Sequence, residues 1–212
     1  MENGLKNKRI LVTAGPTWVA IDKVRVITNI FSGRTGTLIA KEAKKQGAKV
    51  KLLLGPGSFE SPKNVNISRF YYFDQFYRLM QNELRQNKYD IVIHSAAISD
   101  YQPVKKYLKK IPSDKKNFFI KLKPCPKIIK IIKKLQPQTF LVQFKLEVGK
   151  TTKQLIDIAY RSMLKNNADL VVANDLTNLN TAYLIDSNKV ITRVARRTEL
   201  AKKLLRTLEQ KL

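Results

Sequence analysis

Short apolar runs of strand length alternate with segments of helical period along most of the chain, and this alternation limits the possible folds more than any other sequence feature. It predicts an α/β protein with a largely parallel central sheet flanked by helices. The expected strands cover residues 10–14, 50–54, 68–72, 91–94, 140–144 and 170–173. The expected helices cover residues 35–46, ended by Gly47, and residues 75–86, 127–134 and 152–166.

The end of the chain departs from this pattern. Two apolar runs, 182–185 and 190–193, flank the turn-forming residues 186–189, which predicts a β-hairpin extension over about residues 178–195. An amphipathic helix is expected from Thr198 onward. Without an internal repeat or a low-complexity segment, we expect a single domain over residues 1–212.

Two long segments, 15–34 and 101–127, are expected to be loops, the second with a short strand at 118–122. The first begins after a strand with Gly15 and ends at Ser32 and Gly33, where a helix starts. Glycines at such a place let the backbone approach a phosphate, although the same turn can be purely structural. The spacing matches neither the G-x-G-x-x-G fingerprint nor a P-loop.

The charge balance is strongly basic, with 41 Lys and Arg against 16 Asp and Glu and a formal net charge of +25. Composition alone would favour nucleic-acid binding. The lysines, however, are spread over expected helix faces and loops, as in an ordinary solvated surface, so nucleic-acid binding remains the alternative interpretation. A single cysteine, Cys125, and the lack of a long apolar run predict a soluble cytoplasmic protein that does not bind a membrane.

The insertion after the first strand carries a specific pattern. Residues 21–29 read Ile-Asp-x-Val-Arg-x-Ile-Thr-Asn, with Thr-Ala-Gly-x-Thr before them and Ser-Gly after them. This ordered set resembles the opening signature of the phosphopantothenate-cysteine ligases, also called phosphopantothenoylcysteine synthetases. Later stretches agree in order and spacing, namely Ala-Ala-x-x-Asp-Tyr at 96–101, Lys-Ile-Pro-Ser at 110–113, Cys-Pro-Lys-Ile at 125–128, Phe-Lys-Leu-Glu at 144–147 and residues 168–175.

The resemblance implies a Rossmann-like fold and a ligase of coenzyme A biosynthesis, in its stand-alone bacterial form. Such an enzyme joins 4'-phosphopantothenate and L-cysteine through an acyl-nucleotidylate, with CTP more expected than ATP, and with Mg²⁺ as cofactor. It further implies a homodimer, and a separate phosphopantothenoylcysteine decarboxylase acting next. The residues that could hold a metal stay unknown, because the sequence shows no cluster of metal ligands.

The resemblance also suggests roles for three catalytic candidates. Asn29 matches the asparagine that holds the acyl-nucleotide intermediate, where an amide can donate and accept without adding charge. Arg25 matches an arginine whose fork suits a carboxylate or phosphate, with a stiffening salt bridge as the alternative. Lys110 matches the lysine of a mobile loop that closes over the triphosphate, although Lys106 and Lys109 lie close enough for the assignment to shift.

The remaining candidates are binding residues. Each also has a plain structural interpretation, such as a capping residue, a core aromatic or a solvated lysine. They are Gly15, Ser32, Gly33, Ala96, Ala97, Asp100, Pro126, Lys127, Phe144, Lys165, Asn174 and Asp175.

Two lysines that relatives fused to the decarboxylase carry before Ala-Asp-Leu are replaced here by Ser162 and Asn166, with only Lys165 nearby. A nicotinamide-dependent Rossmann enzyme is a second rival, disfavoured because Leu54 and Gly55 stand where an acidic residue would bind the ribose.

Overall fold

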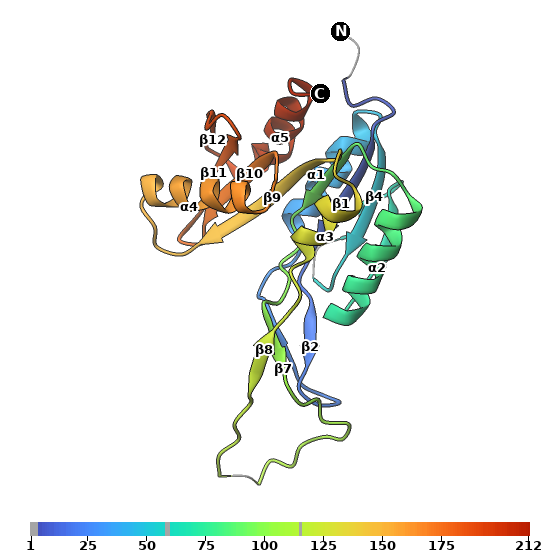
Figure 1. Cartoon of the computed structure of the whole chain (residues 1–212), viewed down its shortest axis with the longest axis vertical. Helices are drawn as coiled ribbons and strands as arrows, with labels where there is room; N and C mark the ends of the chain where they lie inside the picture. The colour runs from blue at the N-terminus through green and yellow to red at the C-terminus, as the bar shows by residue number, and fades with distance from the viewer. Residues whose placement is uncertain (1–3, 58–59, 115) are drawn as a thin grey trace.

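The structure is a computed structural model that describes residues 4–57, 60–114 and 116–212. Its centre is an eight-stranded sheet in the order β12-β11-β10-β9-β6-β1-β4-β5 (Figure 1). The strands from β10 to β5 are parallel, and β11 and β12 are antiparallel, so the predicted parallel sheet with a C-terminal hairpin is confirmed. The strands are β1 (Arg9–Ala14), β4 (Lys49–Leu54), β5 (Asn66–Arg69), β6 (Ile91–His94), β9 (Phe140–Glu147), β10 (Leu170–Asp175), β11 (Asn178–Asp186) and β12 (Ile191–Val194).

Helices cover both faces of this sheet. One face packs against α1 (Arg34–Lys45) and α5 (Leu200–Glu209), and the other against α2 (Phe73–Gln86), α3 (Ile128–Leu135) and α4 (Thr152–Lys165). A one-turn 3-10 helix, Arg197–Glu199, precedes α5. In the part of the chain that the structure describes, no helix is both long and apolar enough to cross a membrane.

The two cores follow from the alternation of side chains along the strands. In β1, Ile10 and Val12 face α1 and α5, whereas Leu11 faces α2 and α3, and all three are fully buried. Burying one such side chain contributes about 1.5–3 kcal/mol. This explains why the parallel strands read as continuous apolar runs, since both faces are covered.

The helix boundaries come from local signals. Helix α1 ends just before Gly47, whose φ of +83° confirms the predicted stop. Helix α4 begins after Thr151, whose hydroxyl accepts the amide of Gln154 while the Gln154 side chain accepts the amide of Thr151. This reciprocal capping box satisfies two amides that the first helical turn leaves free.

Two small antiparallel pairs project from the body and form what we call the arm, residues 16–29, 101–114 and 116–125 (Figure 1). The pairs are β2 (Trp18–Ala20) with β3 (Val26–Thr28), and β7 (Tyr101–Pro103) with β8 (Leu122–Pro124). The expectation of plain loops was therefore wrong here. The strand predicted at 118–122 was also wrong, because pairing with β7 places the strand at Leu122–Pro124 and leaves Phe119 88% exposed.

Candidate functional site

A cavity of about 380 Å³ lies at the carboxyl ends of β1, β6, β9 and β10. After β1 the chain passes through α1 to β4, which lies on one side of β1. After β5 it returns through α2 to β6, which lies on the other side of β1. Parallel α/β sheets bind ligands at such a point, where the loops diverge and leave a crevice. The topology therefore places the strongest candidate site between β1 and β6.

The N-terminus of α1 forms one wall of this cavity. Its N-cap is Gly33, which makes no side-chain capping bond, and the first turn holds no acidic residue. Arg34, Thr35 and Gly36 line the cavity at this turn. The partial positive charge of a helix start and its amides suit an anion such as a phosphate.

Close backbone packing explains the glycines at this wall. Gly33 has a φ of +78°, and a Cβ there would lie 2.9 Å from the backbone nitrogen of Gly15. A Cβ on Gly36 would lie 2.6 Å from the Cβ of Ala14 and would also overlap Ser95 Oγ. The start of α1 can therefore sit directly against the end of β1 only because these positions carry no side chain.

The opposite wall is the turn after β6. Ser95 Oγ donates to the carbonyl of Thr13 at 2.7 Å, and the amide of Ala96 donates to Thr13 Oγ1 at 3.3 Å. His94 Nδ1 lies 2.9 Å from the same hydroxyl, and burial lowers the pKa of this histidine to about 4. These bonds fix the backbone groups of Ala96 and Ala97 at the cavity.

Asn29 stands next to this turn, at the end of β3. Its Nδ2 donates to the carbonyl of Ala97 at 2.9 Å, across 68 positions of sequence. The strand before it is tied in by Thr28 Oγ1, which donates to the carbonyl of Thr17 at 3.1 Å. The arm thus delivers the Asn29 amide to the backbone of a residue that lines the cavity.

Residues 5–211 match the protein family described as "DNA/pantothenate metabolism flavoprotein C-terminal domain". The chain belongs to this family. Membership confirms the resemblance seen in the motifs, and it does not favour the nucleic-acid-binding alternative.

Curated relatives include the "Coenzyme A biosynthesis bifunctional protein CoaBC" of Thermococcus kodakarensis, 38% identical over 98% of this chain and 49% of the relative. The protein of that name from Borreliella burgdorferi is 34% identical, over 96% of this chain and 53% of its own length. The chain therefore spans about half the length of these relatives.

Solved structures of family members share the fold. The "DNA/Pantothenate Metabolism Flavoprotein from Streptococcus pneumoniae" is 31% identical, with a TM-score of 0.87 over 97% of this chain and 100% of that chain. The C-terminal domain of a bifunctional CoaBC is 28% identical, with a TM-score of 0.82 over 99% of this chain and 97% of that chain. The "Cab2 mutant H337A complex with phosphopantothenate-cysteine" is 18% identical, with a TM-score of 0.80 over 97% of this chain and 87% of that chain. At this identity the match supports the fold alone.

The cavity brings together many of the binding residues predicted from the sequence. Those that line it come from the ends of four strands and from the start of α1, and they are Gly15, Ser32, Gly33, Ala96, Ala97, Phe144 and Asn174. Segments as far apart as β1 and β10 meet here because parallel strands present their carboxyl ends at one edge.

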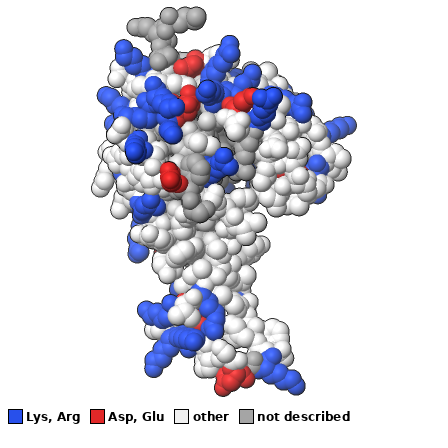
Figure 2. All heavy atoms as spheres, turned by 180° about the vertical axis from the view of Figure 1, so that it is seen from behind, with Lys and Arg blue, Asp and Glu red and all other residues white. Residues whose placement is uncertain are grey.

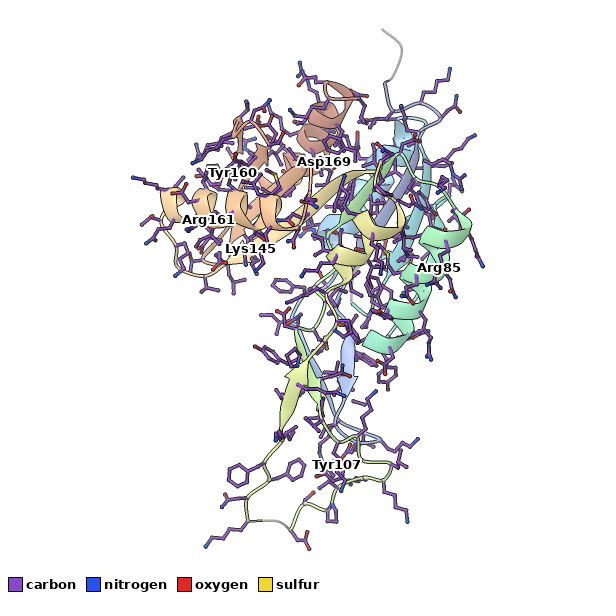
Figure 3. The ribbon with its side chains drawn as sticks, in the orientation of Figure 1. Arg85, Tyr107, Lys145, Tyr160, Arg161 and Asp169 are labelled. Carbon is purple, nitrogen blue, oxygen red and sulfur yellow. The ribbon has the colours of Figure 1, made fainter. Side chains whose placement is uncertain are left out.

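Other lining residues were not among the predicted site residues. The most informative is Lys145 of β9 (Figure 3). Its Nζ lies 2.9 Å from Glu147 Oε1. It follows Phe144 directly in the Phe-Lys-Leu-Glu string, so that motif could have predicted Lys145 as a site residue. Leu176, Leu179 and Leu200 carried no such signal, because only the packing of β11 and α5 brings them to the cavity.

Several predicted residues lie outside the cavity. Asp100 pairs with Lys127 at 2.5 Å, and both are exposed at the base of the arm beside Pro126. Lys165 is exposed at the end of α4, a helix that packs on the sheet face away from α1. The structure does not bring these residues to the cavity, so their contacts with substrates stay predictions.

Asp175 is the last residue of β10, and its buried side chain hydrogen-bonds to two neighbouring loops. Its carboxylate accepts the amides of Gly149 at 3.1 Å and Lys150 at 2.8 Å, together with the hydroxyl and amide of Thr177. The Thr177 hydroxyl, followed by these amides, lowers the pKa of Asp175 to about 2. The carboxylate therefore fixes the loop before α4. This agrees with the structural alternative given above, in which Asp175 is a capping residue.

Arg25 and Lys110 lie on the arm. Arg25 Nη1 donates to Asp22 Oδ2 at 2.5 Å and to the carbonyl of Ile111 at 3.1 Å, so the stiffening salt bridge is present. Lys110 is exposed in the loop between β7 and β8 and does not line the cavity. Burial raises the pKa of the Cys125 thiol, which agrees with a structural cysteine.

Proposed function

We propose that the chain is a phosphopantothenate-cysteine ligase of coenzyme A biosynthesis, which joins 4'-phosphopantothenate to L-cysteine using CTP. The observation that carries the proposal is the cavity itself. Seven of the twelve binding residues inferred from separate motifs line this cavity, next to Asn29, in a member of a family whose curated relatives are CoaBC proteins.

The proposed reaction has two displacements. In the first, a carboxylate oxygen of 4'-phosphopantothenate attacks the α-phosphorus of CTP, the bond to the β-phosphate oxygen breaks, and pyrophosphate leaves. In the second, the cysteine amine attacks the acyl carbon, the bond to the cytidylate oxygen breaks, and CMP leaves while the amine loses a proton. Both steps bring anions together, so positioning and fixed positive charge supply the main acceleration.

The cavity can provide both. The start of α1 would hold phosphate oxygens through its amides, and Lys145 adds a cation to the wall. Phe144 and the backbone of Ala96 and Ala97 would hold the nucleoside. Asn29, fixed by its bond to Ala97, would donate to or accept from the acyl group without adding charge.

Mg²⁺ fits this site as an ion carried by the triphosphate. Within residues 4–57, 60–114 and 116–212, no group of three His, Cys, Asp or Glu side chains could hold a metal. The nearby carboxylate of Asp175 is engaged by amides and a hydroxyl. Mg²⁺ commonly binds through substrate phosphates, so we propose the magnesium complex of CTP as the substrate.

We also propose a homodimer. Lys110 is exposed on the arm and outside the cavity, so it would reach the triphosphate through arm movement or from a second copy. Apolar side chains are exposed along the arm, among them Tyr101 at 56% and Val104 at 49%. On the face that Figure 2 shows, few charged side chains lie between the body and the loop tip, as expected of an interface between copies. A monomer by light scattering at micromolar concentration would contradict this proposal.

The product would pass to a phosphopantothenoylcysteine decarboxylase, and we propose the cytoplasm as the compartment. A reducing compartment keeps the thiol of the substrate cysteine free.

Pyrophosphate release by the purified chain tests the ligase proposal. Reactions would contain Mg²⁺, 4'-phosphopantothenate, cysteine and either CTP or ATP, with each substrate omitted in turn. We expect release with CTP that requires 4'-phosphopantothenate, and 4'-phosphopantothenoylcysteine only when cysteine is present. No release with either nucleotide would contradict the proposal.

A further inference from the structure

A second groove lies at the opposite edge of the sheet, where the parallel strands begin. It has a volume of about 600 Å³ and is lined by Arg9 of β1, by Lys49 and Lys51 of β4, and by Lys44 of α1. The six residues of β1 separate it from the candidate active site, a strand length of about 20 Å. Nothing in the proposed ligase reaction uses this groove.

The groove carries an excess of positive charge that no ion pair among the described residues offsets. In the portion of the chain that is described, Arg9, Lys44, Lys49 and Lys51 form no ion pair with Asp or Glu. The groove also contains the carboxylate of Glu83, which accepts the Tyr89 hydroxyl and, at 2.8 Å, Asn87 Nδ2 and keeps its charge, so four cations face one carboxylate among the described lining residues. Asp90 accepts the backbone amide of Arg9 at 2.7 Å.

Neutral groups hold two of these cations in place. Arg9 Nη2 donates to Asn87 Oδ1 at 2.9 Å, and the guanidinium lies over the Tyr89 ring, 5.6 Å from its centroid. Lys51 Nζ donates to Asn66 Oδ1 at 2.9 Å. Amide and ring partners orient a cation without neutralising its charge, so the positive field stays available to a ligand.

The positions of two of these cations are mutually unfavourable. Arg9 and Lys49 are register partners on adjacent parallel strands, whose backbones lie about 5 Å apart, and like charges that close together repel each other. The C-terminus of α2 can attract a cation such as Arg9, but it does not explain the like-charged pair or the uncompensated lysines. An anion that bridges the cations would remove the repulsion.

We propose that this groove binds a small anion carrying two or more phosphate groups. Its volume is in the range of small-molecule sites. Among the described lining residues the one aromatic side chain is Tyr89, which is 8% exposed and lies beneath Arg9, so this described lining presents no ring for stacking a base. Recognition would therefore rest on phosphate charge, unlike single-stranded nucleic-acid binding, which uses exposed aromatic platforms.

Amide NMR of the full chain, titrated with inorganic tripolyphosphate, tests the proposal independently of ligase activity. We expect saturable shifts at Arg9, Lys49, Lys51 and Asn66, separate from any shifts at residues 33–36. Lys49→Gln combined with Lys51→Gln should weaken this binding at least about tenfold, because two phosphate contacts are lost. Lys202→Gln with Lys203→Gln removes the same charge from exposed positions of α5 and should leave the affinity within about twofold.

Three results would overturn the proposal. One is the absence of saturable shifts at the groove in the folded protein. Another is equal weakening by the two double variants, which would mean non-specific attraction to a basic surface. The third is tighter binding of oligothymidylates with increasing length, which would indicate a nucleic-acid track instead of a small-anion site.

Discussion

Asp22 and Ile111 are 89 positions apart in sequence, yet Asp22 Oδ2 accepts the Ile111 amide at 3.0 Å. The same carboxylate accepts the amides of Val24 and Arg25 at 2.8 Å and the Arg25 guanidinium at 2.5 Å. The Asp22 side chain is completely buried in this position. One carboxylate thus joins the β2–β3 turn to the loop that carries Lys110.

Asp22→Asn should release this loop from the turn. An amide keeps one acceptor oxygen, but its NH₂ group would face the Ile111 amide, and the charge that pairs with Arg25 is lost. We expect hydrogen exchange at the amides of Ile111 and Tyr107 to accelerate at least about tenfold, with exchange in the sheet unchanged.

Asp114→Asn is the matched control for that variant. Asp114 lies in the same loop, is exposed, and has no partner among the described residues, so the same change of charge should leave exchange at Ile111 unaltered. The Ile111 amide, before the other bonds, lowers the pKa of Asp22 from 3.8 to about 2. Since the folded pKa is the lower one, the anchor should persist above pH 4 and weaken between pH 4 and 2. Unchanged exchange at Ile111 in Asp22→Asn would refute the anchor.

His94 gives the protein a second, separate pH dependence. It is the only histidine in the chain, and burial lowers its pKa from 6.5 to about 4. As the pH falls below 6.5 the unfolded chain takes up this proton before the folded one, so stability is lost between pH 6.5 and 4, by about 3 kcal/mol. Urea unfolding across this range, with His94→Asn for comparison, should show a flatter profile in the variant; parallel profiles would contradict the assignment.

Gly36→Ala should damage both the fold and the cavity. The new methyl group would meet Ala14 and Ser95, and overpacking of this kind costs about 1–3 kcal/mol. Displacing the first turn of α1 should also abolish CTP binding in a calorimetric titration. Gly149→Ala is the contrast. No described atom lies within 4 Å of a Cβ there, so the cost comes from its φ of +65°, about 1 kcal/mol. Normal CTP affinity in Gly36→Ala would argue against a nucleotide site at this wall.

Lys145→Gln should raise the KM for the nucleotide about tenfold, because it removes a cation from the cavity wall. Its effect on the KM for 4'-phosphopantothenate should be small. Lys134→Gln removes the same charge from the exposed last turn of α3 and should change neither value. Steady-state kinetics of both variants decide the point, and equal effects would show that the cavity does not hold the triphosphate.

The sequence was sufficient to predict the sheet because its strands are buried on both faces. Ile10 and Leu11, adjacent in β1, belong to opposite cores, so the run is apolar throughout and easy to recognise. The hairpin β11–β12 was recognisable from its turn residues at 186–189. The arm could not be recognised from the sequence, because its three-residue strands depend on distant contacts. Two of these contacts are Asp22 with Ile111 and Trp18 with Tyr71.

The candidate site was predictable to the extent that local strings encode it. Gly33 and Ala97 stand in such strings and line the cavity. Lys165 was predicted from its place in the sequence, and its contact with a substrate stays a prediction because the helical turn that carries it packs on the sheet face away from α1. Leu200 reaches the cavity through the packing of α5 on α1, which no local pattern reveals.

The central claim is that a carboxylate attacks the α-phosphorus of CTP in this chain's cavity, and an isotope measurement tests it most directly. The purified chain would be given 4'-phosphopantothenate labelled with oxygen-18 in its carboxylate, together with cysteine and the magnesium complex of CTP. Mass spectrometry would then locate the label among the products. We predict oxygen-18 in CMP and none in inorganic phosphate, since the attacking oxygen stays with the nucleotide when cysteine displaces it. Label in inorganic phosphate, or no labelled product at all, would contradict the account.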